Sequence, residues 1–224
     1  MYKAGVIGGM GPLATVEFYD RLVHKSPAHS DNEHADIVIL NHASIPDRTQ
    51  CILHHKDEEF LNAIRPDFDL LNTLGVQVIA IPCNTSHYYY DQLTTFTDIP
   101  IVNMVESSIK QVKRLGYSQA CVFCTEGTYA SQIYEKYAQQ HGITVIELAE
   151  EDRHAIMETI YSIKEKNSTE GEKLNAMLSK YCDENTVGIL ACTELSIIDV
   201  DPRYQSRVID ALDVLVEETL QYLY

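Results

Sequence analysis

Short runs rich in β-branched residues alternate with longer amphipathic stretches along nearly the whole chain, and this alternation limits the fold more than any other feature. It is typical of α/β proteins, because parallel strands need a crossover connection that is usually a helix. Strands are predicted at Lys3–Ile7, Ala35–Leu40, Val76–Ile81, Gln119–Cys124, Thr144–Glu147 and Thr186–Ala191. Helices are predicted at Pro12–His24, Lys56–Leu74, Tyr88–Phe96, Glu106–Leu115, Tyr129–His141, Asp152–Lys164, Gly171–Tyr181 and Ala211–Leu220.

The chain also repeats one design after about half its length. "AGVIGGMGP" and "ACVFCTEGT" are each typical of a strand that enters a glycine-containing turn, and "PCNTS" and "ACTELS" each place a cysteine and a threonine after an apolar run. Two similar lobes that face each other would account for both repeats. Each lobe is predicted to hold a mainly parallel sheet flanked by helices.

Composition narrows the classes of partner. The 224 residues carry a net charge of −16, which argues against nucleic acid and anionic membranes, because both attract basic surfaces. The same negative charge would repel an anionic substrate at long range, so nearby cationic side chains would have to bind it. With no signal peptide in the sequence, we expect a cytoplasmic location and six reduced cysteines rather than a disulfide framework.

Two cysteines, Cys83 and Cys192, follow predicted strands, where ligands of open α/β sheets bind. Polar residues follow each of them, and a helix start nearby would supply N–H groups for a carboxylate and lower the pKa of the thiol. An isolated cysteine at such a place is more often a small buried residue. A matched pair favours two-base racemisation, in which one thiolate removes an α-proton and the opposite thiol returns a proton.

The remaining motifs are less specific. Gly9–Ala14 fits the dinucleotide pattern G-x-G-x-x-A, but Asn41 and His42 stand where that pattern expects an acid, so a turn that approaches a small carboxylate fits better. Arg48, expected in a loop after the second strand, is suited to holding a carboxylate bidentately, although an arginine there is more often structural.

Cys121 and Cys124 have C-x-x-C spacing, yet an odd offset on a strand points them to opposite faces. The histidines show no metal-ligand spacing, so no metal site is predicted. Glu194 and His87 flank the two cysteine turns, where an orienting role and ordinary capping or packing are equally compatible with the sequence.

Five motifs together resemble the aspartate racemase family of the cofactor-independent aspartate/glutamate racemase superfamily. They are "GGMGPLAT" (Gly8–Thr15), "IPDRT" (Ile45–Thr49), "PCNTSH" (Pro82–His87), "TEGT" (Thr125–Thr128) and "ACTELS" (Ala191–Ser196), and they cover nearly the whole chain. The resemblance implies two α/β lobes, residues 1–97 plus 210–224 and residues 98–209, with the active site in the cleft between them. It also implies no pyridoxal phosphate or metal, and a homodimer.

Carried over by position, the resemblance assigns roles to single residues. Cys83 and Cys192 correspond to the paired acid/base thiols. A lysine on a helix after an "IY" pair corresponds to Lys164, with Lys166 as the alternative. The other substrate contacts are Met10, Arg48, Asn84, Thr85, Thr125 and Thr193, with Arg48 on the side-chain carboxylate and Asn84, Thr85 and Thr193 on the α-carboxylate.

The predicted function is therefore racemisation of an acidic amino acid, with aspartate favoured and both cysteines required. Glutamate, broad-specificity or hydantoin racemisation is the nearer alternative. A non-catalytic amino-acid-binding protein is the farther one, and retention of both cysteines argues against it.

Overall fold

The computed structural model describes residues 2–166 and 171–224, and the side chain of Lys166 also lies outside the described residues. The chain forms two compact units. Unit 1 comprises Met1–Asn103 and Leu215–Tyr224, and unit 2 comprises Met104–Val214. The divisions expected from the sequence lie at 97/98 and 209/210.

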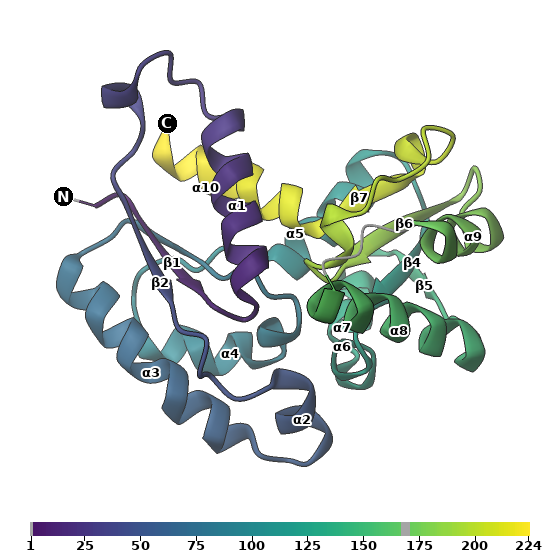
Figure 1. Ribbon diagram of the computed structural model, residues 1–224, viewed down its shortest axis with the longest axis horizontal. Helices are drawn as coiled ribbons and strands as arrows, with labels where there is room; N and C mark the ends of the chain where they lie inside the picture. The colour runs from purple at the N-terminus through teal and green to yellow at the C-terminus, as the bar shows by residue number, and fades with distance from the viewer. Residues whose placement is uncertain (1, 167–170) are drawn as a thin grey trace. The chain divides into compact units, whose positions relative to one another are not determined.

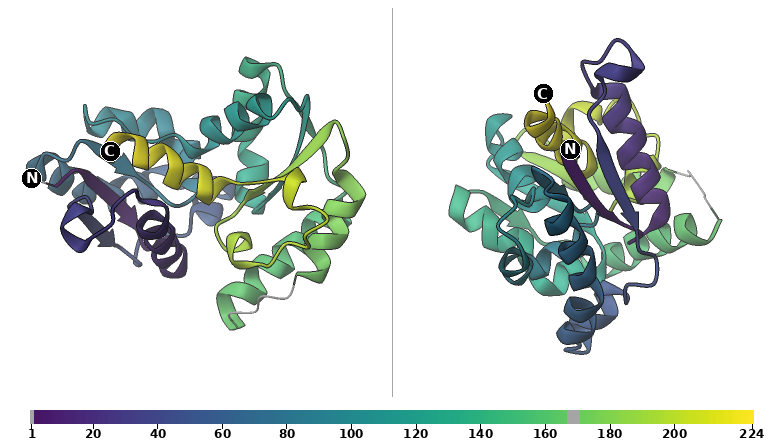
Figure 2. Two further views of the ribbon diagram at one scale, coloured as in Figure 1. Left: turned by 90° about the horizontal axis from the view of Figure 1, so that it is seen from above. Right: turned by 90° about the vertical axis from the view of Figure 1, so that its left-hand side faces the viewer.

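Unit 1 is built on a three-stranded parallel sheet with the order β2-β1-β3. The strands are β1 (Ala4–Gly8), β2 (Ile37–Asn41) and β3 (Val78–Ala80). Every residue of β1 is buried, as expected for a central strand covered on both faces. Figures 1 and 2 show α1 (Pro12–Lys25) and the unit 1 part of α10 (Ala211–Leu223) on one face of the sheet, and α3 (Asp57–Leu74) and α4 (Tyr90–Leu93) on the other.

The core of unit 1 lies between the sheet and α3. Phe60, Ile64, Phe68 and Leu71 recur on one side of α3 and are fully buried, which is the helical period of an amphipathic helix. Tyr89 stacks on Phe60 with ring centroids 4.5 Å apart. The remaining elements of the unit are α2 (Arg48–Leu53) and three short 3-10 helices, at Asp31–Glu33, Thr85–Tyr89 and Thr94–Phe96.

Unit 2 is built on a four-stranded parallel sheet with the order β5-β4-β6-β7. The strands are β4 (Gln119–Cys124), β5 (Thr144–Ile146), β6 (Thr186–Ala191) and β7 (Val208–Asp210). The helices are α5 (Met104–Arg114), α6 (Glu126–Ser131), α7 (Ile133–His141), α8 (Glu150–Lys166) and α9 (Glu172–Tyr181), with 3-10 turns at Leu195–Ile197 and Gln205–Arg207.

The side chains of β4 alternate between two helical layers. Cys121 and Phe123 pack with residues of α8 and α9, including Ile156 and Leu178. Cys124 instead lines a cavity with residues of α6 and α7. The prediction that Cys121 and Cys124 face opposite sides of the strand is therefore confirmed, and all six cysteines are free.

The predicted α/β class, with a parallel sheet in each lobe, is confirmed, and β4 and β6 have the predicted bounds. Two predicted helices were wrong in detail, and one strand was missed. The continuous helix Tyr88–Phe96 is a chain of short helices, and the continuous helix Tyr129–His141 is broken at Gln132, whose φ is 52°. The short strand β7 was not predicted, because three residues are too few to show an alternation.

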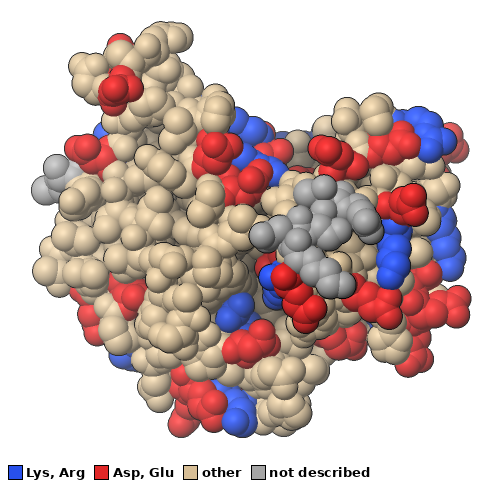
Figure 3. All heavy atoms as spheres, in the orientation of Figure 1, with Lys and Arg blue, Asp and Glu red and all other residues tan. Residues whose placement is uncertain are grey.

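The molecular surface agrees with the acidic composition. Figure 3 shows acidic side chains over the visible face of both units, with basic side chains between them. Within the part of the chain that the structure describes, no helix combines the length and the apolar character needed to cross a bilayer.

Candidate active site

In unit 1, Cys83 lies three residues beyond the end of β3 and is 6% exposed. Its N–H donates to the carbonyl of Ile81, at 2.7 Å, which turns the chain sharply after the strand. Asn84 and Thr85 follow and are buried as well. The turn then enters the 3-10 helix Thr85–Tyr89 and not a long α-helix, so the strong helix dipole expected behind Cys83 is not available.

The glycine-rich turn after β1 approaches the chain beyond β2 very closely. Gly9 has a φ of 89°, and a Cβ there would lie 2.5 Å from the carbonyl carbon of His42. The Gly9 N–H donates to the hydroxyl of Thr15, at 2.9 Å, and this hydroxyl donates to the carbonyl of Gly11. Only glycine fits at position 9. The close approach of this turn to His42 holds the next residue, Met10, in a buried position.

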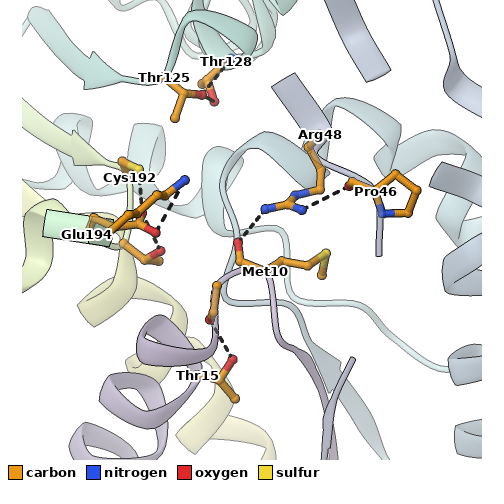
Figure 4. A network of polar contacts seen from close by, with 11 residues as sticks. Met10, Thr15, Pro46, Arg48, Thr125, Thr128, Cys192 and Glu194 are labelled. Carbon is orange, nitrogen blue, oxygen red and sulfur yellow. Dashed lines mark hydrogen bonds and ion pairs between the residues drawn. The ribbon is translucent and has the colours of Figure 1, made fainter. Parts of the chain in front are cut away.

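Arg48 is the first residue of α2, so its predicted position in a loop was wrong. Asp47 caps this helix, because its carboxylate accepts a hydrogen bond from the N–H of Gln50 at 2.9 Å. Figure 4 shows the Arg48 guanidinium between two carbonyl oxygens. It donates to Met10 at 2.9 Å and to Pro46 at 3.1 Å, and the two bonds fix the plane of the guanidinium.

Three predicted motifs thus meet in unit 1. The hydroxyl of Ser86, in the Cys83 turn, donates to the sulfur of Met10 at 3.5 Å, and the carbonyl of Met10 accepts from Arg48. We call Met10, Arg48, Cys83, Asn84 and Thr85 the unit 1 cluster.

His87 is buried beneath this cluster. Its Nδ1 lies 2.9 Å from the carbonyl oxygen of Cys83, and its Nε2 lies 3.2 Å from that of Val102. Burial lowers the pKa of His87, although the two carbonyls partly oppose this effect. The ring is thus placed to support the backbone of the Cys83 turn, a role that the sequence left open against ordinary packing.

In unit 2, Cys192 directly follows β6 and is likewise buried. Its thiol donates to a carboxylate oxygen of Glu194 at 2.9 Å, as Figure 4 shows. The hydroxyl of Thr193 lies 3.5 Å from the same oxygen, and the ammonium of Lys164 lies 3.7 Å from the other one. Lys164, on α8, is therefore joined to Cys192 through Glu194.

Burial, followed by the negative charge of Glu194, raises the pKa of Cys192 well above its ordinary value, and Lys164 opposes this only in part. The sequence had predicted a lowered pKa from a helix start, which is wrong for this thiol. The helix that follows is a 3-10 turn of three residues, Leu195–Ile197, and the nearest charge is an anion. Cys192 therefore holds its proton at neutral pH and is suited to act as a general acid.

Thr125 lies beside Cys192 at the same end of the sheet, because Cys124 pairs with Ala191 in the β4–β6 register. Its hydroxyl caps α6 by accepting from the N–H of Thr128 at 3.2 Å, and the two threonine hydroxyls are 3.1 Å apart. We call Thr125, Lys164, Cys192, Thr193 and Glu194 the unit 2 cluster. Among the described residues, no group of three or more His, Cys, Asp or Glu side chains is arranged to hold a metal ion.

Some contributors were missed in the sequence. Ser86, Thr15 and Thr128 all lie inside the five family motifs, but the sequence predicts no role for them. Their hydroxyl groups bond to the turns that carry the predicted site residues. Ser86 and Thr128 stand one and three residues from the predicted contacts Thr85 and Thr125, and this proximity was the available signal for them. Thr15, five residues from Met10, was marked only by its place in the same motif.

Comparison with known proteins gives consistent results. The model of the Asp/Glu/Hydantoin racemase family matches residues 7–219. The broad specificity amino-acid racemase RacX of Bacillus subtilis is 28% identical over 225 residues, which cover 96% of each chain. The solved structure of Picrophilus torridus aspartate racemase has a TM-score of 0.86 and 26% identity, covering 99% of this chain and 94% of that one.

A more distant match shows the fold alone. Glutamate racemase of Francisella tularensis, solved in complex with D-glutamate, has a TM-score of 0.66 at 20% identity and covers 97% of this chain and 78% of that one.

Proposed function

The chain belongs to the Asp/Glu/Hydantoin racemase family, and from this premise we propose that it racemises an acidic amino acid, preferentially aspartate, with two cysteine thiols and no cofactor. The observation that supports the proposal most is that each unit gathers a buried cysteine and a cation. In unit 1 the turn that carries Cys83 contacts Met10 through Ser86, and the Met10 carbonyl accepts from Arg48. In unit 2 the Cys192 thiol donates to Glu194, which pairs with Lys164. Two cations suit a substrate with two carboxylates.

In the proposed reaction the two clusters hold opposite faces of one substrate. The thiolate of Cys83 takes the α-proton and becomes a thiol, and the electron pair stays on the α-carbon as a carbanion. The thiol of Cys192 then gives its proton to the opposite face and becomes a thiolate. The product has inverted configuration, and the opposite enantiomer is converted by the same steps in reverse.

Asn84, Thr85 and Thr193 are proposed to hold the α-carboxylate, where hydrogen bonds also stabilise the carbanion as charge moves into that group. Arg48 is proposed to hold the side-chain carboxylate, with its guanidinium already oriented by Met10 and Pro46. Lys164, whose side chain is 34% exposed, is proposed to complete this contact, and Thr125 and Met10 line the site.

The protonated state of Cys192 supports the assignment of Cys83 as the base and Cys192 as the acid. The reaction needs one thiol and one thiolate at the same time, and the raised pKa of Cys192 supplies the thiol. Glu194 would hold that proton in place, while Lys164 would partly neutralise the two anions that coexist once Cys192 has lost it.

The proposal is tested by incubating the reduced protein with L-aspartate or L-glutamate, treated with chelator and without pyridoxal phosphate, and following the optical activity. We expect loss of optical activity with aspartate at a higher kcat/KM than with glutamate. Equal rates with both acids would favour a broad specificity instead. No turnover of either acid, or turnover that survives Cys83→Ala or Cys192→Ala, would contradict the two-thiol mechanism.

A further inference from the structure

A separate cavity lies inside unit 2, between the α6–α7 pair and the strands β4 and β5, with a volume of about 230 Å³. The buried apolar side chains of Val122 and Leu148 form part of its wall. Gln132 and Glu147, which are exposed, lie at its mouth. The break between α6 and α7, where Gln132 adopts a left-handed conformation, forms one side of this mouth.

The cavity wall contains two carboxylates, Glu135 and Glu147, and they differ in their partners. Glu147 accepts a hydrogen bond from Tyr129 at 2.7 Å and lies 3.7 Å from the guanidinium of Arg153. Within residues 2–166 and 171–224, no basic side chain forms an ion pair with Glu135, which is half-buried in the cavity wall. Burial and then the charge of Glu147 raise the pKa of Glu135.

Glu135 lines the same cavity as Cys124. The pKa of the Cys124 thiol, at the end of β4, is raised by burial and next by the charge of Glu135. Its charge therefore acts on the end of β4, where Cys124 lies. A cation in this space would be attracted by a carboxylate that water screens only in part.

The cavity and the proposed substrate site differ in charge and therefore suit ligands of opposite charge. An acidic amino acid would meet two carboxylates here, Glu135 and Glu147, at a cost for each. None of the residues of the unit 1 and unit 2 clusters lines it.

We propose that this cavity binds a small organic cation, a primary ammonium carried on a compact hydrocarbon body, with the ammonium on Glu135 and the body against Val122 and Leu148. The volume is larger than the roughly 150 Å³ of an engineered apolar cavity that accepts benzene, so a ligand of one ring and a short side chain fits. The ammonium supplies the counter-charge that the protein does not provide.

The occupied cavity would also reach the substrate site. Thr128 lines the cavity, and its N–H and hydroxyl both lie within hydrogen-bonding distance of the Thr125 hydroxyl. A ligand that shifts α6 therefore moves Thr125, and we expect it to change the KM for the acidic substrate more than kcat. This coupling, unlike the binding itself, rests on the proposed function.

Binding is tested by isothermal titration calorimetry of the whole protein with benzylammonium, benzyl alcohol and benzoate, which share one body and differ in charge. We expect benzylammonium to bind most tightly and benzoate least. Glu135→Gln should weaken benzylammonium by about tenfold or more, because a charged partner is lost. Glu151→Gln, an exposed acid on α8, serves as the matched control and should leave the affinity unchanged.

A second variant, Val145→Phe, places a larger side chain on a half-buried residue of the wall and so reduces the volume of the cavity. It should abolish binding although Glu135 is still present. Circular dichroism confirms that each variant is folded. Equal affinity for the three compounds, or benzylammonium affinity unaffected by Glu135→Gln, would overturn the proposal even if the protein racemises aspartate. Binding that leaves the KM unchanged would overturn the coupling through Thr128 only.

Discussion

Replacing Glu194 with glutamine removes the anion that lies against the Cys192 thiol and keeps a hydrogen-bond acceptor of the same shape. Two unit charges about 4 Å apart repel by about 4 kcal/mol at an effective dielectric constant of about 20. Lys164, 3.7 Å from the other carboxylate oxygen and partly exposed, offsets part of this repulsion. We therefore expect Glu194→Gln to lower the pKa of Cys192 by about 1–2 units, which corresponds to about 1.4–2.7 kcal/mol.

The sign follows from the direction of the shift. Burial and Glu194 raise the pKa of Cys192, so the form with one thiol and one thiolate persists to high pH in the unmodified protein. The high-pH limb of kcat/KM reports loss of the last proton from the thiol pair, and Glu194→Gln should move it to lower pH. Because the equilibrium constant of a racemisation is one, kcat/KM must be equal for both enantiomers at every pH, and both limbs must shift together.

Thiolate absorbance gives a readout that is independent of substrate. The pH titration of thiolate absorbance is recorded for Glu194→Gln and for the double variant that also carries Cys192→Ser. The difference between the two curves is the titration of the Cys192 thiol. Glu165→Gln, an exposed acid next to Lys164, is the matched control. An unchanged titration and an unchanged limb in Glu194→Gln would refute the role given to Glu194.

Two further perturbations concern unit 1. Arg48→Lys should raise the KM for aspartate by about tenfold with a smaller change in kcat, because one ammonium cannot keep both hydrogen bonds to the carbonyl groups and also bind a carboxylate. Steady-state kinetics measure both constants, and an unchanged KM would contradict the prediction. Gly9→Ala should lower the free energy of unfolding by about 2–4 kcal/mol in urea titrations, since its Cβ would lie 2.5 Å from the backbone of His42. Gly75→Ala, also at positive φ but in open space, should cost only about 1 kcal/mol, and equal losses would show that the close approach at Gly9 is not decisive.

The strands that carry the clusters could be predicted because they are buried on both faces and form continuous apolar runs. Both β4 and β6 have the predicted bounds, and the cysteine turn after β6 follows directly. The helix α2 was missed because six residues show little periodicity. Its start was nevertheless marked by Asp47 followed three residues later by Gln50, a capping pattern that places Arg48 on a helix.

The electrostatics of the site were harder to predict. The rule that a helix start lowers a thiol's pKa needs a helix of sufficient length, and the sequence alone did not show that Cys192 precedes a single 3-10 turn. Nor did the two-residue spacing show that Glu194 turns back onto the thiol. The local conformation of a turn decides both, and it depends on tertiary packing.

The central claim is that two thiols work on opposite faces of one substrate, and the most direct test is the fate of deuterium at early times. L-Aspartate is incubated with the reduced protein in D₂O, and the substrate and product enantiomers are separated and analysed by mass spectrometry. We predict that D-aspartate carries α-deuterium while recovered L-aspartate keeps its α-proton, because each face exchanges through its own thiol. Deuterium appearing equally early in both enantiomers would indicate a single base and would contradict the account.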